Sequence, residues 1–389
     1  MIKTFHLSVG YDGKPVLSDI AVHIPKGQLS LVIGPNASGK TTFLKTLAGL
    51  LKPVAGTVFV GADELHRLSN RMKARRIGVL LTGKPDVAGM AVEEVVALGR
   101  YPWTGPVHLL TARDYQIIST VMEKTGISAI RGRRIHEISD GQLQRVMIAR
   151  ALAQEPEILI LDEPTTHLDA KSRIEILTFL RKLAQEENMT VLASTHELEL
   201  AFRFADNLLL VSDGQVVVSD NPEELVNTPA FQHAFGFNGE LTLSPTTLSI
   251  EFRQNTAAKG PAAFVIAGGG TGAKTYRMLL KQGIQVVSGI LHENDIDHHI
   301  ASMLGVETIT EKPFQKISEE TFQKAVKKML SCSMVFYTDP PIAETNRRNL
   351  ELFEKAVENN IPTFRPNAVP YTAMKKAWLP PTAALSTPE

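Results

Sequence analysis

Residues 34–41 are the feature that most constrains how this chain can fold. They read Gly-Pro-Asn-Ala-Ser-Gly-Lys-Thr and fit G-x-x-x-x-G-K-[ST], the pattern of a phosphate-binding loop. The apolar run 29–33 predicts a buried strand before the loop, and residues 42–48 predict the start of a helix after it. Because glycine lacks a Cβ, the backbone N–H groups can turn toward a phosphate, and the helix dipole adds to the attraction. The sequence therefore predicts a nucleoside triphosphate site rather than an ordinary strand-to-helix turn.

Two further segments carry candidate chemistry. Residues 139–142 (Ser-Asp-Gly-Gln) precede an amphipathic helix over 143–152; serine and aspartate favour a helix N-cap, and such a cap also presents N–H groups to an anion. The apolar run 158–161 predicts a central parallel strand ending in Asp162 and Glu163, at the sheet edge where ligands bind. We expect Asp162 to hold Mg²⁺ and Glu163 to polarise the attacking water, with a solvated turn as the alternative.

Three other side chains have predicted roles at the same edge. Lys40 is expected to reach the β- and γ-phosphates, and the Thr41 hydroxyl to bind Mg²⁺. His196 follows the strand predicted over 190–194, where it could hydrogen-bond the γ-phosphate and orient the water; an isolated histidine would otherwise be structural.

Composition excludes several classes of protein. The chain has 389 residues, enough for two or three domains, and 41 Lys and Arg balance 41 Asp and Glu. A zero formal charge gives no reason to expect a nucleic-acid partner. One cysteine, Cys332, excludes an internal disulfide and suits a reducing cytosol. We see no signal peptide and no apolar run long enough to span a membrane, so we expect a soluble, cytoplasmic protein.

The ordered motifs resemble a known family. GPNASGKT, SDGQLQR, LILDEP, THLD and STHE follow one another as in the ATP-binding subunits of ABC transporters, over residues 1–236. The phrase LGRYPWTG, with Asp140 where many relatives have glycine, resembles the subfamily that powers import of iron–siderophore complexes, haem and vitamin B12. The resemblance implies an ATPase domain with a RecA-like core and antiparallel β and helical subdomains. The rival function is a soluble ABC ATPase acting on ribosomes or DNA, but the chain has neither two ATPase cassettes nor a long coiled-coil insertion.

The resemblance also implies residue roles. Tyr11 would stack on adenine, although a tyrosine beside a turn is more often a packing residue. Ser139, Gly141 and Gln142 would close over ATP held by another subunit, Asp169 would lie in the loop communicating between sites, and His196 would be the switch histidine. The residues expected to bind the phosphates and Mg²⁺ are Gly34, Pro35, Asn36, Ala37, Ser38, Gly39, Lys40, Thr41 and Thr42.

One departure from the family concerns Thr82. It stands at the end of the third strand, where the family usually has a glutamine that contacts Mg²⁺ and the attacking water. A threonine is too short to reach as far, so Thr82 is a weak candidate for a metal ligand. We expect a bridging water or a modified coupling step in its place.

One phosphate loop and one signature segment per chain imply partners. A site built from the loop of one subunit and the signature of another predicts a homodimer with two ATP molecules. With no membrane span of its own, the subunit would dock on a separate polytopic permease, peripherally on the cytoplasmic face of the inner membrane, and would act indirectly with a substrate-binding protein. Residues 84–105 are the candidate permease contact.

The C-terminal third predicts a second domain. We expect the ATPase domain over 1–237, a connecting strand and linker over 238–261, a smaller Rossmann-like accessory domain over 262–376 and a disordered tail over 377–389.

Two motifs in this second domain leave their function open. Gly268-x-Gly270-x-x-Ala273 fits the dinucleotide fingerprint, but no clear acid closes the next strand, taken to end at Ile290; a tight turn or another ligand are the alternatives. Residues 292–299 could bind a metal or form a polar loop and helix cap.

Overall fold

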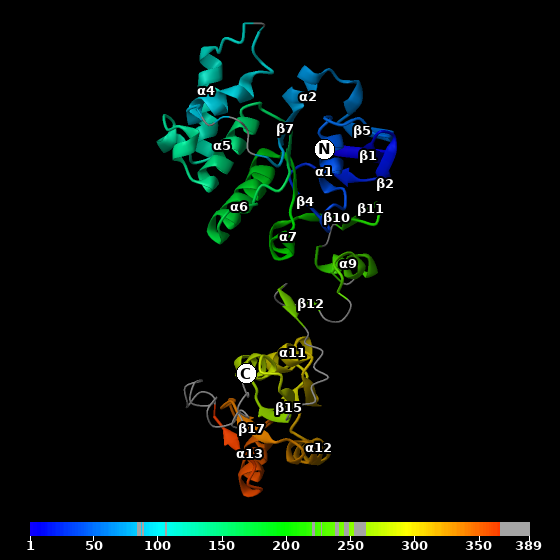
Figure 1. Ribbon diagram of the computed structural model, residues 1–389, viewed down its shortest axis with the longest axis vertical. Helices are drawn as coiled ribbons and strands as arrows, with labels where there is room; N and C mark the ends of the chain where they lie inside the picture. The colour runs from blue at the N-terminus through cyan, green and yellow to red at the C-terminus, as the bar shows by residue number, and fades with distance from the viewer. Residues whose placement is uncertain are drawn as a thin grey trace, which may run out of the picture. The chain divides into compact units, whose positions relative to one another are not determined.

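The chain divides into two compact units, Met1–Gly236 and Phe237–Glu389, and each is described by itself. The computed structural model (Figure 1) describes residues 1–83, 87, 89–105, 107–219, 222–226, 228–237, 241–244, 249–252 and 262–365. Part of the expected permease contact (84–86 and 88), most of the expected linker and the whole expected tail lie outside the described residues.

The first unit contains a six-stranded sheet in the order β11-β10-β4-β9-β8-β7. The strands are β4 (Leu29–Ile33), β7 (Ile77–Leu80), β8 (Ile158–Leu161), β9 (Thr190–Ser194), β10 (Asn207–Ser212) and β11 (Gln215–Ser219). All neighbours are parallel except β10 and β11. The four central strands are almost entirely apolar because helices cover both faces of a parallel sheet. The carboxyl ends of β4, β7, β8 and β9 therefore meet at one edge.

A second, antiparallel sheet lies against helix α1 (Lys40–Leu47). Its strands are β1 (Ile2–Tyr11), β2 (Lys14–Ile20), β3 (His23–Ile24), β5 (Ala55–Val60) and β6 (Asp63–Glu64). Phe43 and Leu47 of α1 are fully buried in one cluster with residues of both sheets, such as Leu7 and Leu192. This packing fixes α1, and with it the loop that precedes the helix.

Helices form the rest of the first unit, with α4 and α5 on the side of the six-stranded sheet away from the antiparallel sheet (Figure 1). The helical segments are η1 (Leu65–Arg67), α2 (Asn70–Arg76), α3 (Val92–Ala97), η2 (Leu98–Arg100), α4 (Ala112–Lys124), η3 (Ser128–Ile130), η4 (Ile135–Glu137), α5 (Asp140–Leu152), α6 (Ala170–Glu187), α7 (Leu198–Phe204), α8 (Pro222–Leu225) and α9 (Pro229–Ala234). Capping residues set where the longest begin: Thr111 caps α4, Ser139 caps α5 and Asp169 caps α6, each accepting a hydrogen bond from a backbone N–H of the first turn.

The second unit is a doubly wound parallel sheet in the order β16-β15-β14-β17-β18. Alternate residues of β14 point to opposite faces: Ala263 and Val265 belong to one buried cluster, and Phe264 and Ile266 to the other. Helices α10 and α11 cover the first face, and α12 and α13 the second. The elements are β12 (Leu241–Leu243), β13 (Ile250–Phe252), β14 (Ala262–Ile266), α10 (Ala273–Leu280), β15 (Gln285–His292), α11 (Ile296–Met303), β16 (Glu307–Glu311), α12 (Glu319–Leu330), β17 (Met334–Tyr337), α13 (Arg348–Glu358) and β18 (Thr363–Phe364).

The predicted fold class is confirmed for both parts of the chain: an α/β nucleotide-binding core with antiparallel and helical additions, and a smaller Rossmann-like sheet. Two details of the second unit differ from expectation. β15 extends past Ile290 to His292, and the strand β16 was not predicted, because its sequence Glu-Thr-Ile-Thr-Glu has a single strongly apolar residue.

Candidate active site

The loop between β4 and α1 has the backbone that its glycines were expected to permit. Gly34 and Gly39 have φ of 153° and 106°, which favour glycine. A Cβ on Gly34 would stand 2.2 Å from the carbonyl oxygen of Val211. Ala37 also has a positive φ, of 61°. The loop therefore curls tightly over the end of β4 at the start of α1.

Lys40 folds back over this loop. Its Nζ donates hydrogen bonds to the carbonyl oxygens of Gly34 and Pro35, both at 2.8 Å. Burial lowers the pKa of Lys40, against the charges of Glu163 and Asp162, which raise it. The ammonium is thus pre-positioned at the loop and electrostatically linked to the two carboxylates that follow β8 at the same edge of the sheet.

Three hydroxyl groups converge on the carboxylate of Asp162. Thr41 Oγ1 donates to its Oδ2 at 2.8 Å, Thr82 Oγ1 donates to the same oxygen at 3.1 Å, and Ser194 Oγ donates to Oδ1 at 2.6 Å. Asp162 is 2% exposed. The same Ser194 oxygen accepts from the Glu163 N–H at 2.8 Å. Three strand ends and the loop therefore place one buried carboxylate beside the Thr41 hydroxyl.

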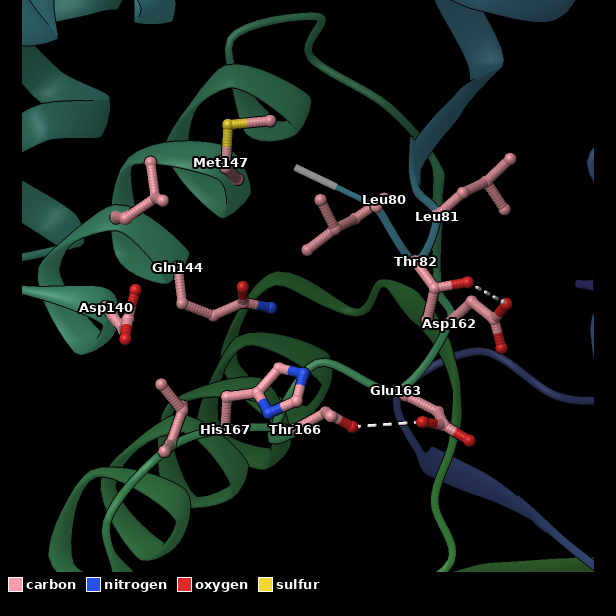
Figure 2. Close-up of a pocket in the computed structure, with 13 residues that line it drawn as sticks. Leu80, Leu81, Thr82, Asp140, Gln144, Met147, Asp162, Glu163, Thr166 and His167 are labelled. Atoms are coloured by element: carbon pink, nitrogen blue, oxygen red, sulfur yellow. Dashed lines mark hydrogen bonds between the residues drawn. The ribbon is translucent and has the colours of Figure 1, made fainter. Parts of the chain in front are cut away.

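Glu163 has a different environment from its neighbour. Its Oε2 accepts a hydrogen bond from Thr166 Oγ1 at 3.0 Å, and His196 Nδ1 lies 3.8 Å from the same oxygen. Glu163 lines a cavity of about 210 Å³, which is also lined by Asp140, Gln144 and His167 (Figure 2). Asp162 lines the same cavity but already accepts three hydroxyl hydrogen bonds, whereas Glu163 accepts one side-chain hydrogen bond among the described residues, so Glu163 has more acceptor positions left for a water.

The structure places the other predicted residues around this centre. Tyr11 ends β1, is 48% exposed, and its hydroxyl lies 3.5 Å from Thr42 Oγ1, so its ring stands beside the start of α1. Asn36 lies in the loop itself. Ser38 has a buried hydroxyl with no hydrogen-bond partner among the described residues.

The signature segment does not join the loop of its own chain. Ser139 and Gln142 form a reciprocal cap: Ser139 Oγ accepts from the Gln142 N–H at 3.3 Å, and Gln142 Oε1 accepts from the Ser139 N–H at 3.1 Å. Gly141 lies against Ser172 of α6. Asp169 accepts hydrogen bonds from the N–H and hydroxyl of Ser172, which lower its pKa. Within the described residues, no hydrogen bond links Ser139, Gly141 or Gln142 to residues 34–42.

Sequence reasoning missed two residues of this site, Ser194 and Thr166. Ser194 is the last residue of a strand predicted correctly, so a hydroxyl at that strand end was a usable signal. Thr166 stands three residues after Glu163, a spacing that allows a local hydrogen bond.

The glycine-rich turn of the second unit is occupied by carboxylates. Gly270 and Gly272 donate their N–H groups to Asp297, at 3.0 to 3.1 Å, and Gly269 donates to Asp295 at 3.1 Å from both oxygens. Burial raises the pKa of Asp297, and the Gly272 N–H opposes that shift. The N–H groups that would meet a dinucleotide phosphate are thus already paired with Asp295 and Asp297, which lie beyond the end of β15 in the N-cap and first turn of α11.

Residues 292–299 had two possible roles, a metal site or a polar loop and helix cap. Asp295 caps α11, accepting a hydrogen bond from the Asp297 N–H, and His292 Nε2 pairs with the carbonyl oxygen of Gln315 at 2.7 Å. Across the part of the chain that the structure describes, no group of three or more His, Cys, Asp or Glu side chains is arranged to hold a metal ion. The described helices also include none that is long and apolar enough to cross a bilayer.

A phosphate loop with two adjacent carboxylates, Asp162 and Glu163, after a strand of the same sheet defines a P-loop nucleoside triphosphatase. A family model agrees, since residues 17–166 match "ABC transporter"; in the second unit, residues 286–375 match "MJ0874 family". An uncharacterised ABC transporter ATP-binding protein of Methanocaldococcus jannaschii is 39% identical over 291 residues, 75% of this chain and all of the relative. The chain belongs to the ATP-binding proteins of ABC transporters, and it is an ATPase.

Other relatives have more specific names. The cobalamin import ATP-binding protein of Halobacterium salinarum is 32% identical over 345 residues, covering 88% of this chain and 86% of the relative. The iron(3+)-hydroxamate import ATP-binding protein of Bacillus subtilis is 34% identical over 246 residues, covering 63% and 91%.

Solved structures show the same fold for the first unit. A Clostridium perfringens protein, part of an ABC transporter complex, has a TM-score of 0.53 at 25% identity, covering 61% of this chain and 95% of that protein. A dimeric ATP-binding cassette in a post-hydrolysis state, bound to ADP and phosphate, has a TM-score of 0.50 at 26% identity, covering 56% and 98%.

Proposed function

We propose that this chain hydrolyses ATP to drive uptake of an iron chelate or cobalamin through a separate membrane permease. The observation that carries the import assignment is the match to the cobalamin import protein. Its 345 aligned residues are more than the 236 residues of the first unit, so the match includes part of the second unit as well. Relatives named for siderophore import support the wider class of metal-chelate substrates.

The chemistry follows from the residues at the sheet edge. Residues 34–42 would hold the phosphates of ATP, with Lys40 neutralising charge on them and Tyr11 stacking on the adenine. Glu163, facing the cavity and supported by Thr166, would polarise the attacking water, and His196 would orient it toward the γ-phosphate.

A magnesium ion fits the donor set beside the loop. The Thr41 hydroxyl and the Asp162 carboxylate are oxygen donors that converge within 2.8 Å, and hard oxygen ligands are those that Mg²⁺ prefers. When bound, the ion would neutralise negative charge on the phosphates. Thr82 also reaches Asp162, so its part in metal binding would pass through that carboxylate.

Two copies of the chain would complete each site. Ser139, Gly141 and Gln142 have no hydrogen bond to residues 34–42 of their own chain within the described part of the structure, so we expect them to meet a nucleotide held by another copy. The related cassette bound to ADP and phosphate is dimeric. We place the homodimer on the cytoplasmic face of the inner membrane, against permease subunits and in indirect contact with a substrate-binding protein, with the second unit as an accessory domain.

Copurification and transport test this proposal. The chain would be expressed with candidate permease subunits from the same organism, and any complex that copurifies would be reconstituted in liposomes with ATP on the side of the ATPase. ATP-dependent accumulation of cobalamin or a ferric hydroxamate, absent with Glu163→Gln, would support it. Failure to bind any permease, together with ATPase activity stimulated by ribosomes or DNA, would contradict it and favour the non-transport function.

A further inference from the structure

Thr82 is brought to the active site by strand register. β7 and β8 are parallel neighbours with Leu80 opposite Leu161, and the N–H of Asp162 donates to the carbonyl oxygen of Leu80 at 2.7 Å. Residues that follow two paired parallel strands emerge side by side at the same edge. Thr82 therefore lies next to Asp162, and Figure 2 shows its hydroxyl directed at the Asp162 carboxylate.

The hydrogen bonds of Asp162 explain what this contact can do. A carboxylate has about four acceptor positions, and hydroxyl groups from three different segments occupy three of them. Thr82 shares Oδ2 with Thr41, whereas Ser194 binds the opposite oxygen Oδ1. Removing Thr82 would leave Oδ2 with one hydroxyl donor, Thr41, in place of two, so that oxygen would be held less firmly.

The residue type suits this role. Threonine is β-branched, so its χ1 angle is restricted, and this one angle sets the position of the hydroxyl. A longer side chain would lose more rotamer entropy when fixed in one position. Asp162 is almost completely buried, whereas Thr82 is exposed, so the hydrogen bond between them is only partly shielded from solvent water.

We propose that Thr82 is a positioning residue that orients the Asp162 carboxylate for the magnesium ion. Its hydroxyl keeps Oδ2 beside the Thr41 hydroxyl before the nucleotide arrives. This inference rests on the proposed function, because it takes Asp162 as a metal-binding residue. A hydrogen bond to a charged group has a strength that corresponds to roughly tenfold in an equilibrium constant, so loss of the Thr82 hydroxyl should weaken Mg²⁺ binding about tenfold.

The test measures metal dependence of nucleotide binding in the full chain. A fluorescent ATP analogue is titrated with Mg²⁺, and separately bound in EDTA, for wild type, Thr82→Val, Thr82→Ala and Thr82→Ser. Valine and alanine remove the hydroxyl, whereas serine keeps it. Thr178→Val is the matched control, because the Thr178 hydroxyl bonds only a carbonyl oxygen of its own helix among the described residues.

The expected result is a rise of about tenfold in the half-saturating Mg²⁺ concentration for valine and alanine, with binding in EDTA unchanged and serine close to wild type. A Mg²⁺ requirement unchanged in both hydroxyl-free variants would overturn the inference, as would an equal loss of affinity in EDTA. Asp162→Asn separates this from the proposed function. If that change also leaves the Mg²⁺ requirement unaltered, the assignment of Asp162 to the metal fails; if it raises the requirement and Thr82→Val does not, only the role of Thr82 fails.

Discussion

A buried ion pair should stabilise the end of the helix that carries the signature segment. Arg100 Nε donates to Asp114 Oδ1 at 2.8 Å, and both side chains are less than 10% exposed. The same guanidinium donates through Nη1 to the carbonyl oxygen of Ala153, the C-cap of α5, at 2.7 Å and to Glu155 Oε2 at 2.9 Å. Replacing Asp114 by asparagine removes the charge while preserving the shape of the side chain.

The pKa of Asp114 gives the size of the effect. Burial would raise this pKa, but hydrogen bonds from the Thr111 hydroxyl and N–H and from Arg100, with the Arg100 charge, outweigh it and lower the pKa from 3.8 to about 2. A shift of this size corresponds to about 2 to 3 kcal/mol of folding free energy at neutral pH. Breaking a buried pair costs roughly 3 to 5 kcal/mol, and Glu155 remains beside Arg100 to reduce that cost.

Calorimetry of the full chain measures the predicted loss. The transition of the first unit can be recognised because ATP raises its melting temperature. For a unit of 236 residues, Asp114→Asn should lower that temperature by roughly 5 to 10 °C. The depressed pKa means that the wild-type advantage is complete above about pH 4 and is lost as the pH falls toward 2.

The control for this prediction is an exposed ion pair. Lys124 and Glu187 lie 2.6 Å apart but are both more than a third exposed, so Glu187→Gln should cost less than about 1 kcal/mol. If the two variants melt alike at neutral pH, or if the Asp114→Asn deficit stays constant through the acid range, the reasoning about burial is wrong.

Three further outcomes are expected. Glu163→Gln keeps the oxygen that accepts a local hydrogen bond but cannot take a proton, so phosphate release should fall by about 10² to 10⁴ while a fluorescent ATP analogue binds as before; near-normal turnover would remove Glu163 from catalysis. Gly34→Ala would place a Cβ 2.2 Å from the Val211 carbonyl oxygen at a φ of 153°, so ATP affinity measured by calorimetry should fall at least about tenfold, and normal affinity would contradict the proposed loop geometry. Because Asp297 accepts from the N–H groups of Gly270 and Gly272, millimolar NAD⁺ or NADP⁺ should not raise the melting temperature of the second unit. A clear rise would show that a phosphate can displace the Asp297 carboxylate from these N–H groups.

Local sequence predicted the parts of the site that depend on local geometry. The loop before Lys40 could be predicted because its glycines are required by backbone angles within one turn of chain. Asp162 and Glu163 could be placed at a sheet edge because an entirely apolar run ends there. Their chemical roles remain predictions that Asp162→Asn and Glu163→Gln test, and the roles of Tyr11 and His196 also remain predictions.

The parts that could not be predicted depend on pairing between distant segments. Thr82 reaches Asp162 across 80 residues only because β7 and β8 share a register, and no local pattern contains that information. Asp297 meets Gly272 across 25 residues for a similar reason. The early end assigned to β15 hid this contact, since it separated the acids from the strand that delivers them.

The acids that bind the N–H groups of the glycine-rich turn determine whether the turn needs an anion from outside the chain. In a loop whose N–H groups are exposed, a bound phosphate supplies their hydrogen-bond acceptors. Here Asp297 supplies the anion from within the chain, so the N–H groups of Gly270 and Gly272 have hydrogen-bond partners without a bound phosphate.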